Sequence, residues 1–257
     1  VTYLDPGSSQ MGKKESIADT AKVLGRFYDG IEYRGFDQDL VEELGANAGV
    51  PVWNGLTDKW HPTQMIADML TIKENFGKLR GINFVYMGDC RNNMANSLAV
   101  TCAKLGVNFT ACGPKELWPE EDVQDLAREL AEVHGSKVHF TEDVKEATTD
   151  AHVIYTDIWV SMGEPEEVWE QRIEQLHPYQ VNKAAMDNAR EDAIFMHCLP
   201  SFHDLNTTIG KEIYDKFGDK YELNGQEVSE EVFLSHQSKV FDEAENRMHT
   251  IKAIMYA

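Results

Sequence analysis

Three short segments carry side chains that could do chemistry, and each follows a predicted strand. His61 comes after the apolar run at 50–53 and directly before a predicted helix that begins at Pro62. Thr63 and Gln64 lie in the first turn of that helix, where backbone N–H groups have no intrahelical partner. Donors gathered at a helix N-terminus can bind an anion or a carbonyl oxygen, so this segment is a candidate binding site. The alternative is that His61 only caps the helix.

The second segment follows a predicted strand at 152–158. It contains Asp157 at the strand end, then Ser161 and Met162 beside a glycine. A carboxylate at a strand end, next to a hydroxyl group and flexible backbone, could hold an ammonium group. The alternative is an ordinary loop in which the serine caps the next helix.

The third segment follows a predicted strand at 193–196 and reads His197-Cys198-Leu199. A cysteine beside a histidine suggests thiolate chemistry. However, neighbouring residues on a strand point to opposite faces, and free cysteines are commonly buried and inert. We therefore do not favour a cysteine nucleophile.

Two arginines and an asparagine are further candidates. Arg26 lies late in the first predicted helix and Arg247 lies early in the last. Their default role is a surface ion pair, and Glu243, four residues before Arg247, is an available partner. Asn93 lies at a strand-to-helix turn, where it could reach a ligand or cap the helix. The turn at 88–93 lacks the G-x-G-x-x-G pattern, which argues against a dinucleotide-dependent dehydrogenase.

These residues need a scaffold, and strand and helix signals alternate along the chain. Strands of four to seven residues separated by helices indicate an α/β fold with parallel sheets, whose sites lie beyond the carboxyl ends of the strands. Predicted strands lie at 1–4, 30–33, 50–53, 82–87, 108–112, 137–141, 152–158 and 193–198, and predicted helices at 14–28, 38–46, 62–76, 94–105, 119–134, 166–176, 180–188, 229–235 and 242–256.

Composition excludes several classes of protein. The 257 residues include 44 Asp and Glu against 24 Lys and Arg, a formal net charge of −20, which repels nucleic acid and anionic lipid. Apolar runs are too short for a membrane span. The four cysteines form no C-x-x-C pair, as expected of a cytoplasmic protein with reduced thiols. The nine histidines show no metal-ligand spacing, so neither a metal nor a cofactor is implied.

Taken together, these segments resemble the ornithine carbamoyltransferases, and the resemblance extends over essentially the whole chain. It implies an α/β fold of two domains, each with a central parallel sheet flanked by helices. The C-terminal helix is expected to cross back to the first domain. The expected boundaries are 1–78 for a carbamoyl phosphate-binding domain, 79–240 for an ornithine-binding domain and 241–257 for the C-terminal helix. The matching motifs are Gly7-Ser8-Ser9-Gln10, Leu24-Gly25-Arg26-Phe27-Tyr28, His61-Pro62-Thr63-Gln64, Asp157 with Ser161-Met162-Gly163, His197-Cys198-Leu199-Pro200, and the run that ends in Arg247.

The resemblance also implies an activity and a set of roles. The expected reaction transfers the carbamoyl group of carbamoyl phosphate to the δ-amine of L-ornithine, in a homotrimer or a larger assembly of trimers without a cofactor. Arg26, His61, Cys198 and Arg247 are the implied catalytic residues. Carbamoyl phosphate would be bound by Gln10, Arg26, His61, Gln64, Cys198, Leu199 and Arg247, and ornithine by Asn93, Asp157, Ser161 and Met162.

One feature departs from the family pattern. The family's phosphate loop, Ser-Thr-Arg-Thr, normally precedes a strand like Val1–Leu4, and it does not occur in this sequence. We therefore expect the chain to be incomplete at its N-terminus. Two alternatives remain: a putrescine carbamoyltransferase, which would have no use for Asp157 as an ammonium partner, and a catalytically inactive binding or scaffold subunit.

Overall fold

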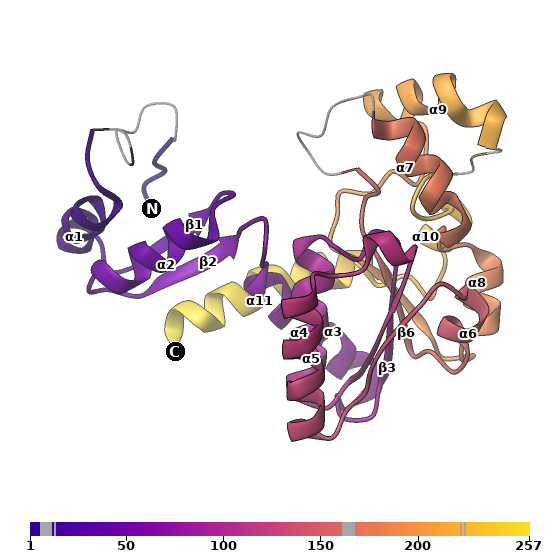
Figure 1. Ribbon diagram of the computed structural model, residues 1–257, viewed down its shortest axis with the longest axis horizontal. Coiled ribbons are helices and arrows are strands. Elements are labelled where there is room, and N and C mark those ends of the chain that lie inside the picture. The colour runs from indigo at the N-terminus through magenta and orange to yellow at the C-terminus, as the bar shows by residue number, and fades with distance from the viewer. Residues whose placement is uncertain (6–11, 13, 161–167, 222, 224) are drawn as a thin grey trace. The chain divides into compact units, whose positions relative to one another are not determined.

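The computed structural model describes residues 1–5, 12, 14–160, 168–221, 223 and 225–257 (Figure 1). Its contacts divide the chain into two compact units. They are called here the N-terminal unit, Val1–Thr63, and the C-terminal unit, Gln64–Ala257.

The N-terminal unit packs two helices beside a two-stranded parallel sheet, in which Ile31 lies opposite Val52. Its small core contains Ala21, Leu44 and Ala48. The first helix begins later than predicted because the Ser16 hydroxyl caps it, accepting the N–H of Asp19 at 3.1 Å. The elements are α1 (Ile17–Phe27), β1 (Ile31–Arg34), α2 (Gln38–Asn47) and β2 (Val52–Leu56).

The strand predicted at Val1–Leu4 is wrong. Residues 1–5 carry no regular secondary structure. A strand persists only with a hydrogen-bonded neighbour, and among the described residues of this unit the sheet consists of β1 and β2 alone. The sequence of residues 1–4 favours an extended chain but does not show whether a neighbouring strand is present.

The C-terminal unit is built on a five-stranded, all-parallel sheet with the order β5-β4-β3-β6-β7. The chain starts at the central strand, moves outward through β4 and β5, and then returns to place β6 on the other side of β3. The carboxyl ends of β3 and β6 therefore flank the topological switch point, where open α/β sheets bind ligands. The strands are β3 (Asn83–Met87), β4 (Asn108–Cys112), β5 (Val138–Thr141), β6 (Val153–Thr156) and β7 (Ile194–His197).

Helices cover both faces of this sheet: α4 and α5 lie on one side, and α6 and α8 on the other (Figure 1). Met65, Met69 and Ile72 of α3 are buried on the first face, as their helical spacing predicted. No described helix is long and apolar enough to cross a membrane. The helices are α3 (Pro62–Phe76), α4 (Asn93–Leu105), α5 (Glu121–His134), α6 (Val144–Thr148), α7 (Trp169–Leu176), α8 (Lys183–Asn188), α9 (Thr208–Tyr221), α10 (Glu230–Phe233) and α11 (Val240–Tyr256), with 3₁₀ turns η1 (Lys115–Leu117) and η3 (His177–Tyr179).

Two of these helices were not predicted. Helix α9 contains Gly210 and Gly218, and glycine within a helix weakens the sequence signal because it lowers helix propensity. Helix α6 has only five residues, and its start is fixed by the Asp143 side chain, which accepts the N–H of Glu146 at 3.0 Å.

Helix α11 buries a polar face. Met248 and Met255, which share an apolar face at helical spacing, are 64% and 62% exposed. The buried side chains are Val240 in the first turn and then three polar ones, Glu243, Asn246 and Thr250. Burial of polar groups requires hydrogen-bonding partners, so the neighbours of α11 decide which face turns inward.

Those partners lie partly in α3. The Asn246 amide donates to Thr71 Oγ1 at 2.9 Å and to Glu74 Oε2 at 2.7 Å. The C-terminal helix thus returns to α3, a helix of the segment 1–78 that the sequence assigned to the first domain. The predicted return of this helix is confirmed.

We expect Gly25→Ala to destabilise the N-terminal unit. A Cβ at Gly25 would lie 1.8 Å from the carbonyl oxygen of Ala48, a backbone atom just after α2. The two helices would have to separate, which we expect to lower the free energy of unfolding by about 1–3 kcal/mol. Urea unfolding measures this.

The matched control is Gly45→Ala in α2, where an added Cβ would meet nothing within 4 Å. This change should raise the free energy of unfolding by up to ~1 kcal/mol, because alanine has the higher helix propensity. The same response to both substitutions would contradict the assigned α1–α2 contact.

Candidate active site

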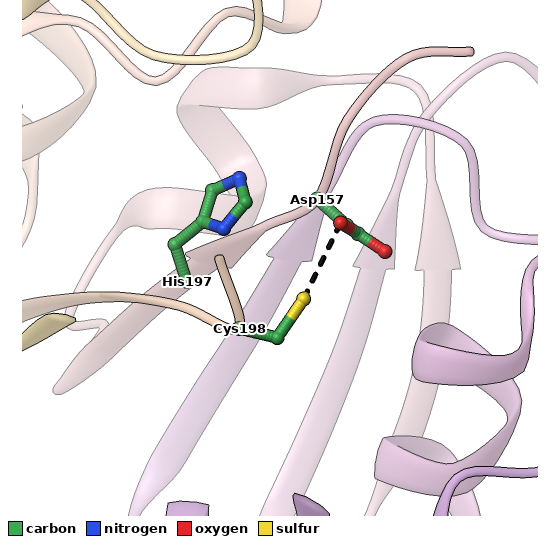
Figure 2. A group of neighbouring side chains, drawn as sticks. All are labelled: Asp157, His197 and Cys198. Atoms are coloured by element: carbon green, nitrogen blue, oxygen red, sulfur yellow. Dashed lines mark hydrogen bonds between the residues drawn. The ribbon is translucent and has the colours of Figure 1, made fainter. Parts of the chain in front are cut away.

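Asp157 and Cys198 meet at the carboxyl ends of two neighbouring strands. Asp157 follows β6 and Cys198 follows β7, so parallel pairing places both residues at one edge of the sheet. The Cys198 thiol donates to Asp157 Oδ1 at 3.3 Å (Figure 2). Burial and the nearby Asp157 carboxylate raise the pKa of Cys198 well above its usual value. The thiol therefore stays protonated at neutral pH and acts as a hydrogen-bond donor.

The Asp157 carboxylate is surrounded by neutral donors. Its Oδ1 also accepts the N–H of Ile158 at 2.8 Å, and its Oδ2 lies 3.5 Å from the Asn92 amide nitrogen. Burial raises the pKa of Asp157 above its ordinary value. Because its described hydrogen-bond donors are neutral, an ionised Asp157 keeps its negative charge available for a cationic ligand.

Asn92 connects Asp157 to the start of α4. Its Oδ1 caps the helix by accepting the N–H of Ala95 at 2.8 Å, while its Nδ2 donates to the Tyr86 hydroxyl at 2.8 Å. Asn93, the predicted ligand, is the first residue of α4 and is partly buried. The helix N-terminus thus lies beside the switch point.

The side chains of His197 and Cys198 leave the backbone in different directions, although a ring nitrogen and the thiol sulfur stay within 4.8 Å of each other (Figure 2). The Leu199 N–H donates to its Nδ1 at 2.9 Å, and its Nε2 lies 3.3 Å from Glu227 Oε1. Burial lowers the pKa of His197, but the hydrogen bond and charge of Glu227 outweigh this and raise it. Since Nδ1 accepts a bond, the geometry corresponds to the neutral tautomer with the proton on Nε2, facing Glu227.

The backbone at Leu199 adopts a conformation that few residues other than glycine adopt. Its φ is +58°, in the left-handed region. The hydrogen bond from its N–H to His197 helps to hold this conformation, and strained backbone of this kind concentrates at functional sites. Leu199 thus follows Cys198 in a turn that the buried histidine anchors.

Gln64 and Arg247 also meet within the C-terminal unit. Arg247 Nη1 donates to Gln64 Oε1 at 2.8 Å. Gln64 Nε2 donates in turn to Asp68 Oδ1 at 2.8 Å and to Glu243 Oε1 at 3.0 Å. The amide therefore connects the arginine of α11 to two buried carboxyl groups.

The remaining predicted residues lie in the N-terminal unit or outside the described residues. In the N-terminal unit, Arg26 is exposed in α1 and His61 is buried just before α3. Gln10, Ser161 and Met162 lie outside the described residues. Their roles therefore stay predictions.

Several polar residues near the site carry little signal in the sequence. Asp68 follows Gln64 by four residues on α3, a helical spacing that could have suggested a contact. Tyr155 lies on an apolar strand, and Glu227 lies in an acidic stretch, so neither position signals a role. The spacing of Glu243 indicates only a partner for Arg247.

The same edge of the sheet holds a set of potential metal ligands. Ligand atoms of Asp157, His197 and Cys198 all lie within 4.8 Å of one another, and carboxylate, imidazole and thiolate are ligands that zinc accepts. A metal ion would have to remove the thiol proton and break the bond from Leu199 to the imidazole. The sequence-based expectation of a metal-free reaction stays a prediction.

Comparisons with known proteins cover both parts of the chain. The sequence model of the aspartate/ornithine carbamoyltransferase carbamoyl-P binding domain matches residues 1–74, and that of the Asp/Orn binding domain matches residues 80–257. The chain is 68% identical over all 257 residues to a catabolic ornithine carbamoyltransferase of Treponema denticola and spans 75% of that protein. A catabolic ornithine carbamoyltransferase of Mycoplasma capricolum subsp. capripneumoniae is 57% identical over 94% of this chain and 76% of its own length.

The fold agrees with these matches. An ornithine carbamoyltransferase from Pyrococcus furiosus superposes with a TM-score of 0.86 at 39% identity, over 99% of this chain and 74% of that one. The chain therefore belongs to the aspartate/ornithine carbamoyltransferase family.

Proposed function

We propose that the protein is an ornithine carbamoyltransferase, which transfers the carbamoyl group of carbamoyl phosphate to the δ-amine of L-ornithine and forms L-citrulline and phosphate. The observation that carries this proposal is the Asp157 carboxylate at the switch point, whose described hydrogen-bond donors are all neutral. An α-amino acid offers an ammonium group to such a carboxylate, whereas carbamoyl phosphate does not. The names of the relatives support the same substrate.

Asp157 would bind the α-ammonium group of ornithine. Asn93, Ser161 and Met162 are the proposed neighbours of its α-amino and carboxylate ends. The other end of the substrate carries the attacking amine, which must be neutral to react. Because an alkylamine has a reference pKa near that of lysine, about 10.4, the reactive fraction rises with pH through the neutral range.

Carbamoyl phosphate requires donors for a developing oxyanion and cations for the leaving phosphate. We assign Arg26 and Arg247 to the cationic role, and His61, Gln64 and Gln10 to the carbamoyl group and its phosphate. Cys198 and the backbone carbonyl of Leu199 would line the reaction centre. Since Cys198 stays protonated, positioning of the two substrates, and not covalent catalysis, would supply most of the rate enhancement.

The proposal also covers the oligomeric state, the cellular location and the domain boundaries of the enzyme. We infer a cytoplasmic homotrimer, or a larger assembly of trimers, with the domain boundaries at 1–78, 79–240 and 241–257. The word "catabolic" in the names of two relatives favours degradation of arginine over its synthesis.

A substrate panel tests the function. The protein expressed from its whole gene should form citrulline from ornithine and carbamoyl phosphate, and should react with ornithine in preference to putrescine and aspartate. Preference for putrescine would instead indicate the related diamine enzyme. Failure to use any of the three amines would indicate an inactive binding subunit.

We expect Asp157→Asn to raise the KM for ornithine while leaving the KM for carbamoyl phosphate nearly unchanged. Loss of a charge-assisted hydrogen bond removes roughly 1.5–3 kcal/mol, which corresponds to about one to two decades in kcat/KM for ornithine. Steady-state kinetics with each substrate varied in turn measure both values. Asp187→Asn is the matched control, because Asp187 is exposed and pairs with Lys183.

The difference between wild type and Asp157→Asn should depend on pH. Burial raises the pKa of Asp157, so this carboxylate gains its proton at a higher pH than an ordinary aspartate does. As the pH falls towards that pKa, the wild type loses its anionic partner and its advantage over the variant shrinks. Unchanged ornithine kinetics in Asp157→Asn, or an advantage that grows on acidification, would exclude the assigned role.

We expect Cys198→Ser to retain measurable activity, since a serine hydroxyl can also donate to Asp157. Because the donor is kept and only its length and polarity change, kcat should fall by about tenfold or less. Cys198→Ala, which removes the donor, should lose more. Mass spectrometry of the wild type during turnover should find no carbamoyl group on Cys198, and detection of that adduct would overturn the positional mechanism.

A further inference from the structure

We propose that Asp68 and Glu243 form a buried carboxyl pair that shares one proton and positions Gln64 and Arg247 for carbamoyl phosphate. The identity of the ligand rests on the proposed function. The pair itself rests on the contacts of α3, α11, β6 and β7. Neither residue belongs to the substrate-binding set that the sequence motifs imply.

Glu243 is the acceptor at the centre of these contacts. It is 0% exposed. Its Oε1 accepts the Tyr155 hydroxyl at 2.9 Å and the Gln64 amide at 3.0 Å, and its Oε2 accepts the backbone N–H of His197 at 3.0 Å. Three donors converge on one carboxylate, which is the arrangement that stabilises the ionised form.

Asp68 lies beside this carboxylate and is also 0% exposed. Its Oδ1 accepts the Gln64 amide, while its Oδ2 receives no hydrogen bond from the described protein groups. The carboxyl groups of Asp68 and Glu243 both accept from the same Gln64 amide nitrogen, at 2.8 and 3.0 Å, and two buried carboxyl groups this close together favour one proton between them over two negative charges.

The pattern of donors places that proton. Burial and the adjacent Glu243 raise the pKa of Asp68 well above its ordinary value. Burial raises the pKa of Glu243 as well, and its hydrogen bonds to Asp68, Tyr155 and His197 reduce this increase without reversing it. Because three donors converge on Glu243 and Asp68 Oδ2 receives none, we assign the proton to Asp68 and the negative charge to Glu243.

This charge fixes the orientation of the Gln64 amide. Its NH₂ group faces two carboxyl groups, so its carbonyl oxygen faces the Arg247 guanidinium. A flipped amide would place NH₂ against a cation and a carbonyl oxygen against a carboxylate. The pair thus acts through Gln64 on Arg247. Through the N–H of His197, Glu243 also holds the strand end that carries Cys198.

Substitutions of the two carboxyl residues should have different effects. Asp68→Ala removes the shared proton and one anchor of Gln64, and should raise the KM for carbamoyl phosphate about tenfold or more. Asp68→Asn should recover most of this loss, because the asparagine NH₂ donates to Glu243 where protonated Asp68 does. Glu243→Gln should not show such recovery, since its NH₂ would face another donor. It should raise the same KM at least about tenfold and leave the KM for ornithine less affected.

Glu245→Gln is the matched control on the same helix, because Glu245 is exposed and pairs with His249. A variant that merely folds poorly would lower the active fraction and leave KM unchanged. The positioning role is wrong if Asp68→Asn raises the KM for carbamoyl phosphate as much as Asp68→Ala does. It is also wrong if Glu243→Gln keeps the wild-type KM for carbamoyl phosphate.

An infrared measurement tests the shared proton without using activity. The wild type at neutral pH should show the carbonyl stretch of a protonated carboxylic acid, and Asp68→Asn should lack it. Its absence from the wild type, or its persistence in Asp68→Asn, would overturn the pair. A wild type that forms no citrulline but shows the band would contradict the proposed function and leave the pair standing.

Discussion

A carboxylate taken out of water must be met by donors, and Glu243 imposes this constraint on the C-terminal unit. A hydroxyl group from β6, a backbone N–H from β7 and an amide from α3 all converge on it. Each of these donors reaches the carboxylate only when its strand or helix is in one position along its axis. The same requirement explains why α11 turns Glu243, Asn246 and Thr250 inward while its methionines remain exposed.

The parallel sheet determines which residues meet at the candidate site. Because β3, β6 and β7 run side by side in one direction, Asn92, Asp157 and Cys198 come from distant parts of the chain to one edge. The contacts among them leave the thiol protonated and the Asp157 charge without a described cationic donor. A protonated thiol and an available carboxylate suit the orientation of an amino acid better than nucleophilic attack.

The sequence predicted the strands of the five-stranded sheet closely, because short runs of four to seven residues bounded by turn signals have few alternatives. It also placed the start of α3 at Pro62, where a fixed φ and a missing N–H suit the first turn. The prediction of a strand at Val1–Leu4 was wrong, because a strand needs a hydrogen-bonded neighbour. Helix α9 was not predicted, because its glycines lower the helix propensity of the segment. The inward face of α11 was not predictable either. Asn246 bonds to Thr71, 175 residues earlier, and no local pattern encodes such a contact.

The protonation of Cys198 has a consequence for the chemical durability of the protein. The thiolate is the form that reacts with peroxides and with disulfides. Burial raises the pKa of Cys90 and Cys102 well above the ordinary value and that of Cys112 to about 12, and Cys198 is shifted in the same direction. None of the four cysteines is therefore primed for oxidation at neutral pH. A strand end that carries a buried, protonated thiol can in this way tolerate oxidising surroundings that would modify an exposed thiolate.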